Sequence, residues 1–183
     1  MKSMTGHSLS ALLAGILLLG AADALQADDK AMIDANTERA IHWLKNSGGD
    51  AGELLERAHG VLIMPDLVQM KFGAGGEFGE GALLVDGETV DYYASAGKAF
   101  GVPEETEFKA EVIFFLSEEA LETFRSRTSW KAGEFEPVTV IAGDSPEALK
   151  AAKSKGMVGV VFTEDGYLSG KGLKGDRLTR IVR

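Results

Sequence analysis

A run of glycines, KFGAGGEFGEGAL at residues 71–83, has the most unusual spacing in this sequence. It does not fit the dinucleotide-binding fingerprint, which needs Gly at the first, third and sixth positions, because counting from Gly73 the sixth residue is Phe78. The phosphate-loop pattern GxxxxGK[ST] fails as well. Its nearest match, around Gly170-Lys171, has Asp165 in place of the first glycine. The glycines therefore predict no nucleotide chemistry.

Candidate catalytic side chains are few. Ser95 and Lys98 satisfy SxxK, the nucleophile signature of penicillin-recognising enzymes, but the companion triplets SDN and KTG are missing. His42 and His59 lie in neither a metal-ligand nor a triad pattern, and the chain has no cysteine. We therefore expect no enzyme, no catalytic residue, no metal site and no cofactor.

The glycine run is better explained as an extended strand. Side chains then alternate between faces, so that one face carries Gly73, Gly75, Glu77, Gly79 and Gly81, and Glu80 lies on the other. Glu77 and Glu80 on opposite faces cannot form a paired-carboxylate site. A face without side chains indicates a bend or the close approach of another group. We favour packing under rings such as Tyr92, Phe100 or Trp130 in a curved sheet; a direct ligand surface remains the alternative.

The first residues have the pattern of a secretory signal peptide. Lys2 precedes an apolar run from Leu9 to Ala22, and small residues follow at Ala22, Ala24 and Ala27. The run is shorter than the roughly 20 residues that a membrane-spanning helix needs. We expect cleavage after Ala27, export to the periplasm, and two segments: a signal peptide over 1–27 and a single domain over 28–183.

The chain is acidic, with a formal net charge of −9. Because nucleic-acid binding requires many basic side chains, we expect no nucleic-acid partner. The stretch from 146 to 183 differs, since its basic residues outnumber the acidic ones; the basic ones are Lys150, Lys153, Lys155, Lys171, Lys174, Arg177, Arg180 and Arg183.

The periodicity of apolar residues predicts helices first and strands afterwards. A helical period runs from about 29 to 45, and a short second helix begins at Asp50. Strands are predicted over 60–64, 72–84, 108–116, 137–142, 157–162 and 176–183, with a hairpin turn at Asp86-Gly87. Further helices are predicted after Ser117 and between Ser145 and Gly156. The fold class is α+β: a curved, largely antiparallel sheet, barrel-like or sandwich-like, with N-terminal helices and short helices between strands.

Three stretches carry a resemblance to a known family: AHGVLIMPDLVQMKFGAGGEFGEGALLVDGETVDYY, VIFFLSEEALETFR and GVVFTEDGYLSGKGLKGDRLTRI. They resemble the SYLF domain, a family of lipid-binding modules found in bacterial exported proteins and in eukaryotic proteins of actin and endocytic function. The segment FGVPEETEF at 100–108 departs from the family pattern. The N-terminal region is acidic where eukaryotic members are basic, so their membrane contact there is not carried over.

The resemblance implies an exported, non-catalytic lipid-binding module of the bacterial cell envelope, recognising an anionic lipid or a similar amphiphile at a membrane surface. The alternative is an envelope scaffolding domain that binds a protein partner and no lipid. The candidate lipid contacts are the basic residues near the last strand, where a field that attracts anions is expected: Lys171, Lys174, Arg177 and Arg180.

Overall fold

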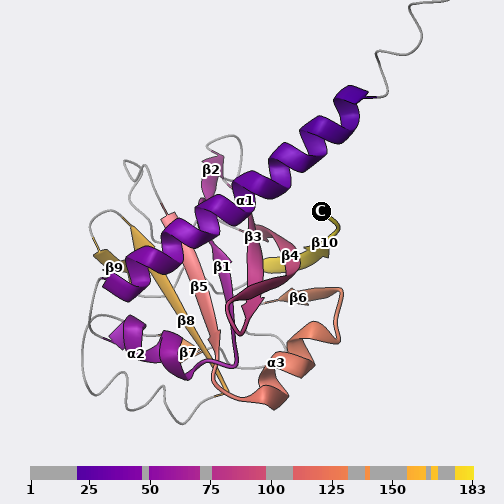
Figure 1. The fold of residues 1–183 in the computed structure, drawn as a ribbon. Helices are drawn as coiled ribbons and strands as arrows, with labels where there is room; N and C mark the ends of the chain where they lie inside the picture. The colour runs from indigo at the N-terminus through magenta and orange to yellow at the C-terminus, as the bar shows by residue number, and fades with distance from the viewer. Residues whose placement is uncertain are drawn as a thin grey trace, which may run out of the picture.

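The computed structural model describes residues 20–46, 50–70, 76–97, 109–131, 139–140, 156–163, 166–168 and 176–183. Within these residues, helices pack against a curled, largely antiparallel sheet (Figure 1). The predicted α+β class with a curved sheet is confirmed. The helix predicted between Ser145 and Gly156 lies outside the described residues.

Helix α1 (Gly20–Asn46) begins earlier than the predicted start near 29, which was wrong. Residues 20–27 are rich in alanine, which favours helix and extends it towards the N-terminus. Among the side chains described on α1, the buried ones share one face with helical spacing: Ile33, Thr37, Ala40 and Leu44. These four residues would remain in the chain after cleavage at Ala27. No helix in the described ranges combines the length and the apolar character that crossing a bilayer requires.

Helix α2 (Asp50–Arg57) lies next to the C-terminal end of α1 and buries Ala51 and Leu54. Strand β1 (Gly60–Met64) follows and is buried along its whole length. It lies in the middle of the sheet, between β3 (Gly76–Val85) and β5 (Lys109–Phe115), and is antiparallel to both.

The predicted hairpin joins β3 to β4 (Glu88–Gly97). Both turn residues have positive φ, 53° at Asp86 and 84° at Gly87, as a two-residue hairpin turn of this hand requires. The register shifts between Leu83 and Leu84, so that Val90 of β4 has no partner residue on β3. Such a bulge increases the local twist of the strands.

The strand order is β6-β10-β4-β3-β1-β5-β8-β7, with short β2 (Val68–Met70) paired to β3 and β9 (Gly166–Leu168) paired to β8 (Met157–Thr163). Strand β7 (Thr139–Val140) is parallel to β8, the one parallel pairing among the described strands. Strand β10 (Arg177–Ile181) lies between β4 and β6 (Ser129–Lys131). The short strands β2 and β6 were not predicted.

The sheet buries a hydrophobic cluster on each face. On one face α1 and α2 pack over residues that include Val61, Ile63 and Phe114. On the other face, α3 (Glu118–Arg125) packs over residues that include Leu62, Leu83 and Trp130. As predicted, Ser117 caps α3, and its side chain accepts a hydrogen bond of 3.2 Å from the Ala120 backbone N–H. Below, these are called the α1 face and the α3 face.

Candidate functional site

The glycines of β3 lie under the chain segment 63–67. A Cβ atom on Gly79 would lie 2.6 Å from Leu67 Cδ2 and 2.7 Å from the Asp66 carbonyl oxygen. A Cβ atom on Gly81 would overlap the Ile63 carbonyl oxygen and lie 2.7 Å from Met64 Sδ. The face of β3 that carries Gly79 and Gly81 therefore leaves room for the end of β1 and for the turn that follows it.

The expected covering by rings needs correction. Tyr92 belongs to the hydrophobic cluster of the α1 face, the opposite side of the sheet, and the atoms nearest to Gly79 and Gly81 come from residues 63–67. Trp130 lies in the hydrophobic cluster of the α3 face, the same side as these glycines, but its atoms are not among the nearest to Gly79 or Gly81. Phe100, Gly73 and Gly75 lie outside the described residues. An aliphatic side chain and backbone carbonyls approach a bare strand more closely than a ring does.

One row of neighbouring residues runs across β3, β4 and the start of β10, and it consists of Glu77, Gly97 and Asp176. Glu77 of β3 pairs directly with Gly97 of β4. Asp176 directly precedes Arg177, whose partner is Ala96, so Asp176 lies beside Gly97 on the other side. The Asp176 carboxylate occupies the place of the missing side chain at Gly97, so a Cβ atom on Gly97 would overlap it. Because residue 97 is glycine, the Glu77 and Asp176 side chains can approach each other over β4.

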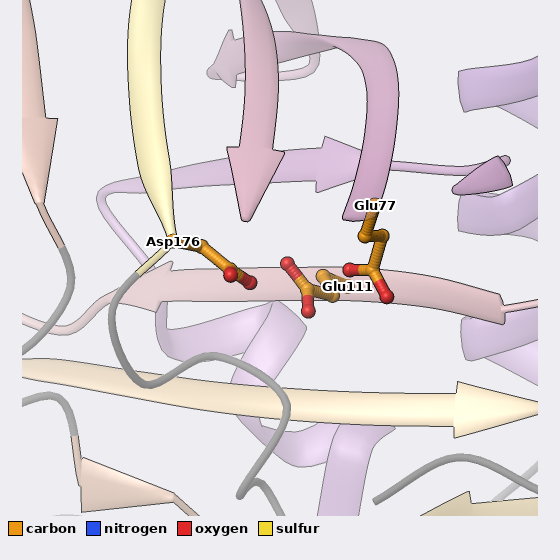
Figure 2. Close-up of side chains that lie close together, drawn as sticks. All are labelled: Glu77, Glu111 and Asp176. Atoms are coloured by element: carbon orange, nitrogen blue, oxygen red, sulfur yellow. The ribbon is translucent and has the colours of Figure 1, made fainter. Parts of the chain in front are cut away.

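A third carboxylate reaches the same place from β5. Glu111 pairs with Met64, the last residue of β1, so it lies where β1 leaves the space between β3 and β5. Ligand atoms of Glu77, Glu111 and Asp176 all lie within 4.8 Å of one another. Figure 2 shows their carboxylates turned towards one another, with that of Glu111 between the other two in this view. We call Glu77, Glu111 and Asp176 the carboxylate cluster.

All three members of the cluster are buried, with exposed fractions of 2%, 1% and 1%. Carboxylates are rarely buried in proteins unless they are neutralised or hydrogen-bonded, so three together are a chemical feature of this fold. Glu77 is the one carboxylate on the glycine face of its own strand, and Glu111 and Asp176 join it from β5 and from the residue before β10.

Sequence reasoning missed Glu111 and Asp176, although each left a signal. Glu111 is the one acidic residue within a predicted strand that is otherwise apolar from Ala110 to Leu116. Asp176 alternates with Leu178 on the buried face of β10. A charged residue at a buried strand position is the pattern to look for.

The possible catalytic residues occupy different environments. Ser95 is 1% exposed, on the α3 face of β4, and its Oγ has no hydrogen-bond partner within the described part of the chain. Tyr93, two residues earlier on that face, has its pKa raised to about 12 by burial and by the nearby Asp91 charge, so it stays protonated at ordinary pH. His42 and His59 are exposed. Lys98 lies outside the described residues.

The basic candidates on β10 are not one surface. Arg177 is exposed, and its guanidinium donates a hydrogen bond of 3.3 Å to Ser129 Oγ. Arg180 lies on the opposite face of β10 and forms an ion pair of 3.7 Å with Asp91, which also pairs with Arg125 at 3.0 Å. Lys171 and Lys174 lie outside the described residues.

A cavity of about 530 Å³ lies between the two N-terminal helices and the sheet. Its apolar lining comes from Ile41 of α1, Leu55 of α2, Ala58, Val61 and Leu84, and its charged lining residues are Lys45, Glu56 and Asp86. A second hollow, of about 990 Å³, runs between α1 and β4 and shares Ile41, Lys45 and Leu84 with the first. Its charged lining residues are Lys30, Arg39 and Lys45 with Asp34, Glu38 and Glu88. We call them the apolar cavity and the polar groove.

A charged network fastens α1 to β4 in the polar groove. Lys30 forms an ion pair of 2.8 Å with Asp34, and the Tyr92 hydroxyl donates a 2.7 Å hydrogen bond to the same carboxylate. Burial tends to raise the pKa of Asp34, but the hydrogen bonds from Lys30 and Tyr92 outweigh it and hold the pKa below its ordinary value of 3.8.

We expect Asp34→Asn to destabilise the chain by about 1 kcal/mol at pH 7, the range for an exposed charged hydrogen bond. Since the pKa of Asp34 is lower in the folded state, its contribution is complete well above pH 3.8 and falls as the pH drops below that value. Urea unfolding at several pH values between 6 and 3 measures this. The gap between parent and variant should narrow in acid, and a constant gap would contradict this role for Asp34.

The sequence matches no protein-family model, and no curated protein matches it either. Function is therefore inferred from the geometry of this chain and from the resemblance described above.

Proposed function

We propose that the protein is a non-catalytic, amphiphile-binding module that holds an apolar chain between its N-terminal helices and its sheet. The apolar cavity carries this proposal. Its volume of about 530 Å³ suits a small-molecule ligand, since such pockets typically measure about 300 to 1,000 Å³ and are mostly apolar. The resemblance to the SYLF domain supports the same class of ligand.

The polar groove suits a headgroup. It shares the lining residues Ile41, Lys45, Leu84 and Gly87 with the apolar cavity, so the two hollows are neighbours and suit a molecule with an apolar tail and a polar head. Lys45 is exposed, and Lys30 and Arg39 line the groove beside it. Lys30 is paired with Asp34, so Arg39 and Lys45 are the cations that favour an anionic headgroup, whereas Glu38 and Glu88 limit how much negative charge the groove accepts.

The basic residues Lys171, Lys174, Arg177 and Arg180 are a second candidate contact, with a membrane surface that supplies the ligand. Of the two described ones, Arg177 is exposed and Arg180 is engaged by Asp91. We further infer export to the periplasm as a peripheral envelope protein, because residues 1–27 have the pattern of a signal peptide.

Ala58→Trp tests the cavity, because a bulky ring at this lining residue fills it. The probe is a fatty acid with a dansyl group, whose fluorescence rises when the probe leaves water. We expect the parent to bind the probe and Ala58→Trp to bind it at least about tenfold more weakly, because the loss of a few buried methylenes already costs that much.

Ala31→Trp is the matched control, since Ala31 is exposed on α1 and lines neither hollow. It should bind like the parent, and thermal melting should show both variants folded. A triple Lys171, Lys174, Arg177→Ala variant separates the second contact: it should reduce sedimentation with anionic vesicles and leave probe binding unchanged. A parent that binds neither probe nor vesicles would contradict the proposal and favour the scaffolding alternative.

A further inference from the structure

We propose that Glu77, Glu111 and Asp176, together with the Ser95 hydroxyl, bind one divalent metal ion, with Ca²⁺ as the preferred ion. Three strands and the residue before β10 supply the oxygen atoms. The site is separate from the apolar cavity and the polar groove, because it lies on the α3 face of the sheet and they lie on the α1 face.

The spacing of the carboxylates fits a shared ion. Their ligand atoms all lie within 4.8 Å of one another. Two oxygens on opposite sides of a Ca²⁺ ion are about 4.6 to 5.2 Å apart, and neighbouring ligands are closer. The smaller Mg²⁺ ion would require all ligands to lie within about 4.2 Å. No rearrangement of strands is needed for the three side chains to reach one Ca²⁺ ion.

The buried hydroxyl of Ser95 is a second, independent indication that a ligand binds here. Its hydroxyl is 1% exposed and has no hydrogen-bond partner among the described residues, and an unsatisfied buried hydroxyl is costly. Ser95 and Gly97 share one face of β4, and the Asp176 carboxylate lies where a side chain at Gly97 would be. The cluster is therefore the next group along this face from Ser95. Gly79, the partner of Ser95 on β3, is the next residue after Glu77 on this face, and Leu67 and the Asp66 carbonyl lie above it.

Charge and chemistry point to the same class of ion. A divalent cation attracts carboxylate oxygens and can hold several of them around one point. Carboxylate and hydroxyl oxygens are hard ligands, which suit Ca²⁺, Mg²⁺ and Mn²⁺ and not the ions that prefer thiolates or imidazoles. The cluster also lies at the ends of strands, since Glu77 is near the start of β3 and Asp176 precedes β10. Entry of an ion thus does not require passage through the hydrophobic core.

Titration calorimetry on the full chain, first stripped with EDTA, tests the site with CaCl₂, MgCl₂ and MnCl₂ as the only added ligands. We expect one Ca²⁺ per chain, weaker Mg²⁺ binding, and a higher melting temperature in Ca²⁺ than in EDTA, because an ion that binds only the folded state stabilises it. Glu111→Gln should weaken Ca²⁺ binding at least about tenfold, since even the loss of a residue that only supports a metal ligand has that effect.

Glu80→Gln is the matched control. Glu80 is on β3 like Glu77, but on the opposite face, where it pairs with Arg183, so Ca²⁺ affinity should not change. Ser95→Ala should weaken binding, and Asp176→Asn provides a second test if Glu111→Gln fails to fold. The proposal is overturned if the parent binds none of the three ions at 10 mM, or if Glu111→Gln binds Ca²⁺ like the parent. A parent that binds no ion and loses stability on Glu111→Gln would show that another group of the chain balances the cluster in place of a metal ion.

Discussion

Gly81→Ala is expected to destabilise the folded chain by about 3 kcal/mol or more, at the upper end of the cost of overpacking. The added methyl group would overlap the backbone carbonyl of Ile63 and lie 2.7 Å from Met64 Sδ. A backbone carbonyl within a paired strand cannot rotate away as a side chain can, so β1 has to move relative to β3. Domains of this size have about 5 to 15 kcal/mol of stability in total, which makes such a loss severe. Urea unfolding measures it.

Gly52→Ala is the matched control for the same added methyl group. Gly52 lies within α2, and its Cβ atom would meet only the Leu44 carbonyl oxygen, at an ordinary distance of 3.8 Å. Alanine favours helix over glycine, so this variant should gain up to about 1 kcal/mol. If Gly81→Ala unfolds at the same urea concentration as the parent, the Ile63 carbonyl does not lie close enough to Gly81 to exclude a methyl group.

Phe124→Ala should cost about 3 to 5 kcal/mol, the usual loss for an aromatic side chain removed from a core. Phe124 is 1% exposed and lies at the centre of an aromatic cluster. Its ring centroid is 5.0 Å from that of Tyr93, 4.9 Å from that of Phe115 and 5.7 Å from that of Trp130. The substitution removes the side chain that joins α3 to three strands at once.

Phe78→Ala is the control for the Phe124 prediction. Phe78 is on β3 but is 45% exposed, so the same truncation should cost less than about 1 kcal/mol. Thermal and urea unfolding of both variants should differ clearly. Equal losses at the two positions would mean that α3 does not depend on the aromatic cluster.

Local features of the fold were predictable because neighbouring residues determine them. The Asp86-Gly87 turn needs only the tolerance of these two residues for positive φ, and Ser117 needs only the free N–H of Ala120. In each case the interaction spans a few residues.

The carboxylate cluster was not predictable in this way, because it depends on which strands are neighbours. Alternation indicates that Glu77 and Gly79 share a face, but not that β10 lies against β4 or that β1 ends opposite Glu111. Gly97 carried no signal by itself, since its role depends on having carboxylates on both sides. The early start of α1 was missed for a different reason: helix propensity continues through a segment that was interpreted only as a cleavage region.

The position of β10 affects how a newly made chain folds. Leu178 pairs with Ser95, so β4 has no partner on that side until residues 177–181 have joined the sheet. Until then, the nascent chain carries an unpaired strand edge that can join with other chains. Pairing between such distant segments also slows folding, because a long loop has to close first. A chaperone that shields β4 while the chain folds would therefore raise the yield of folded protein. A chain that stops before Asp176 would lack both the partner of β4 and one member of the carboxylate cluster.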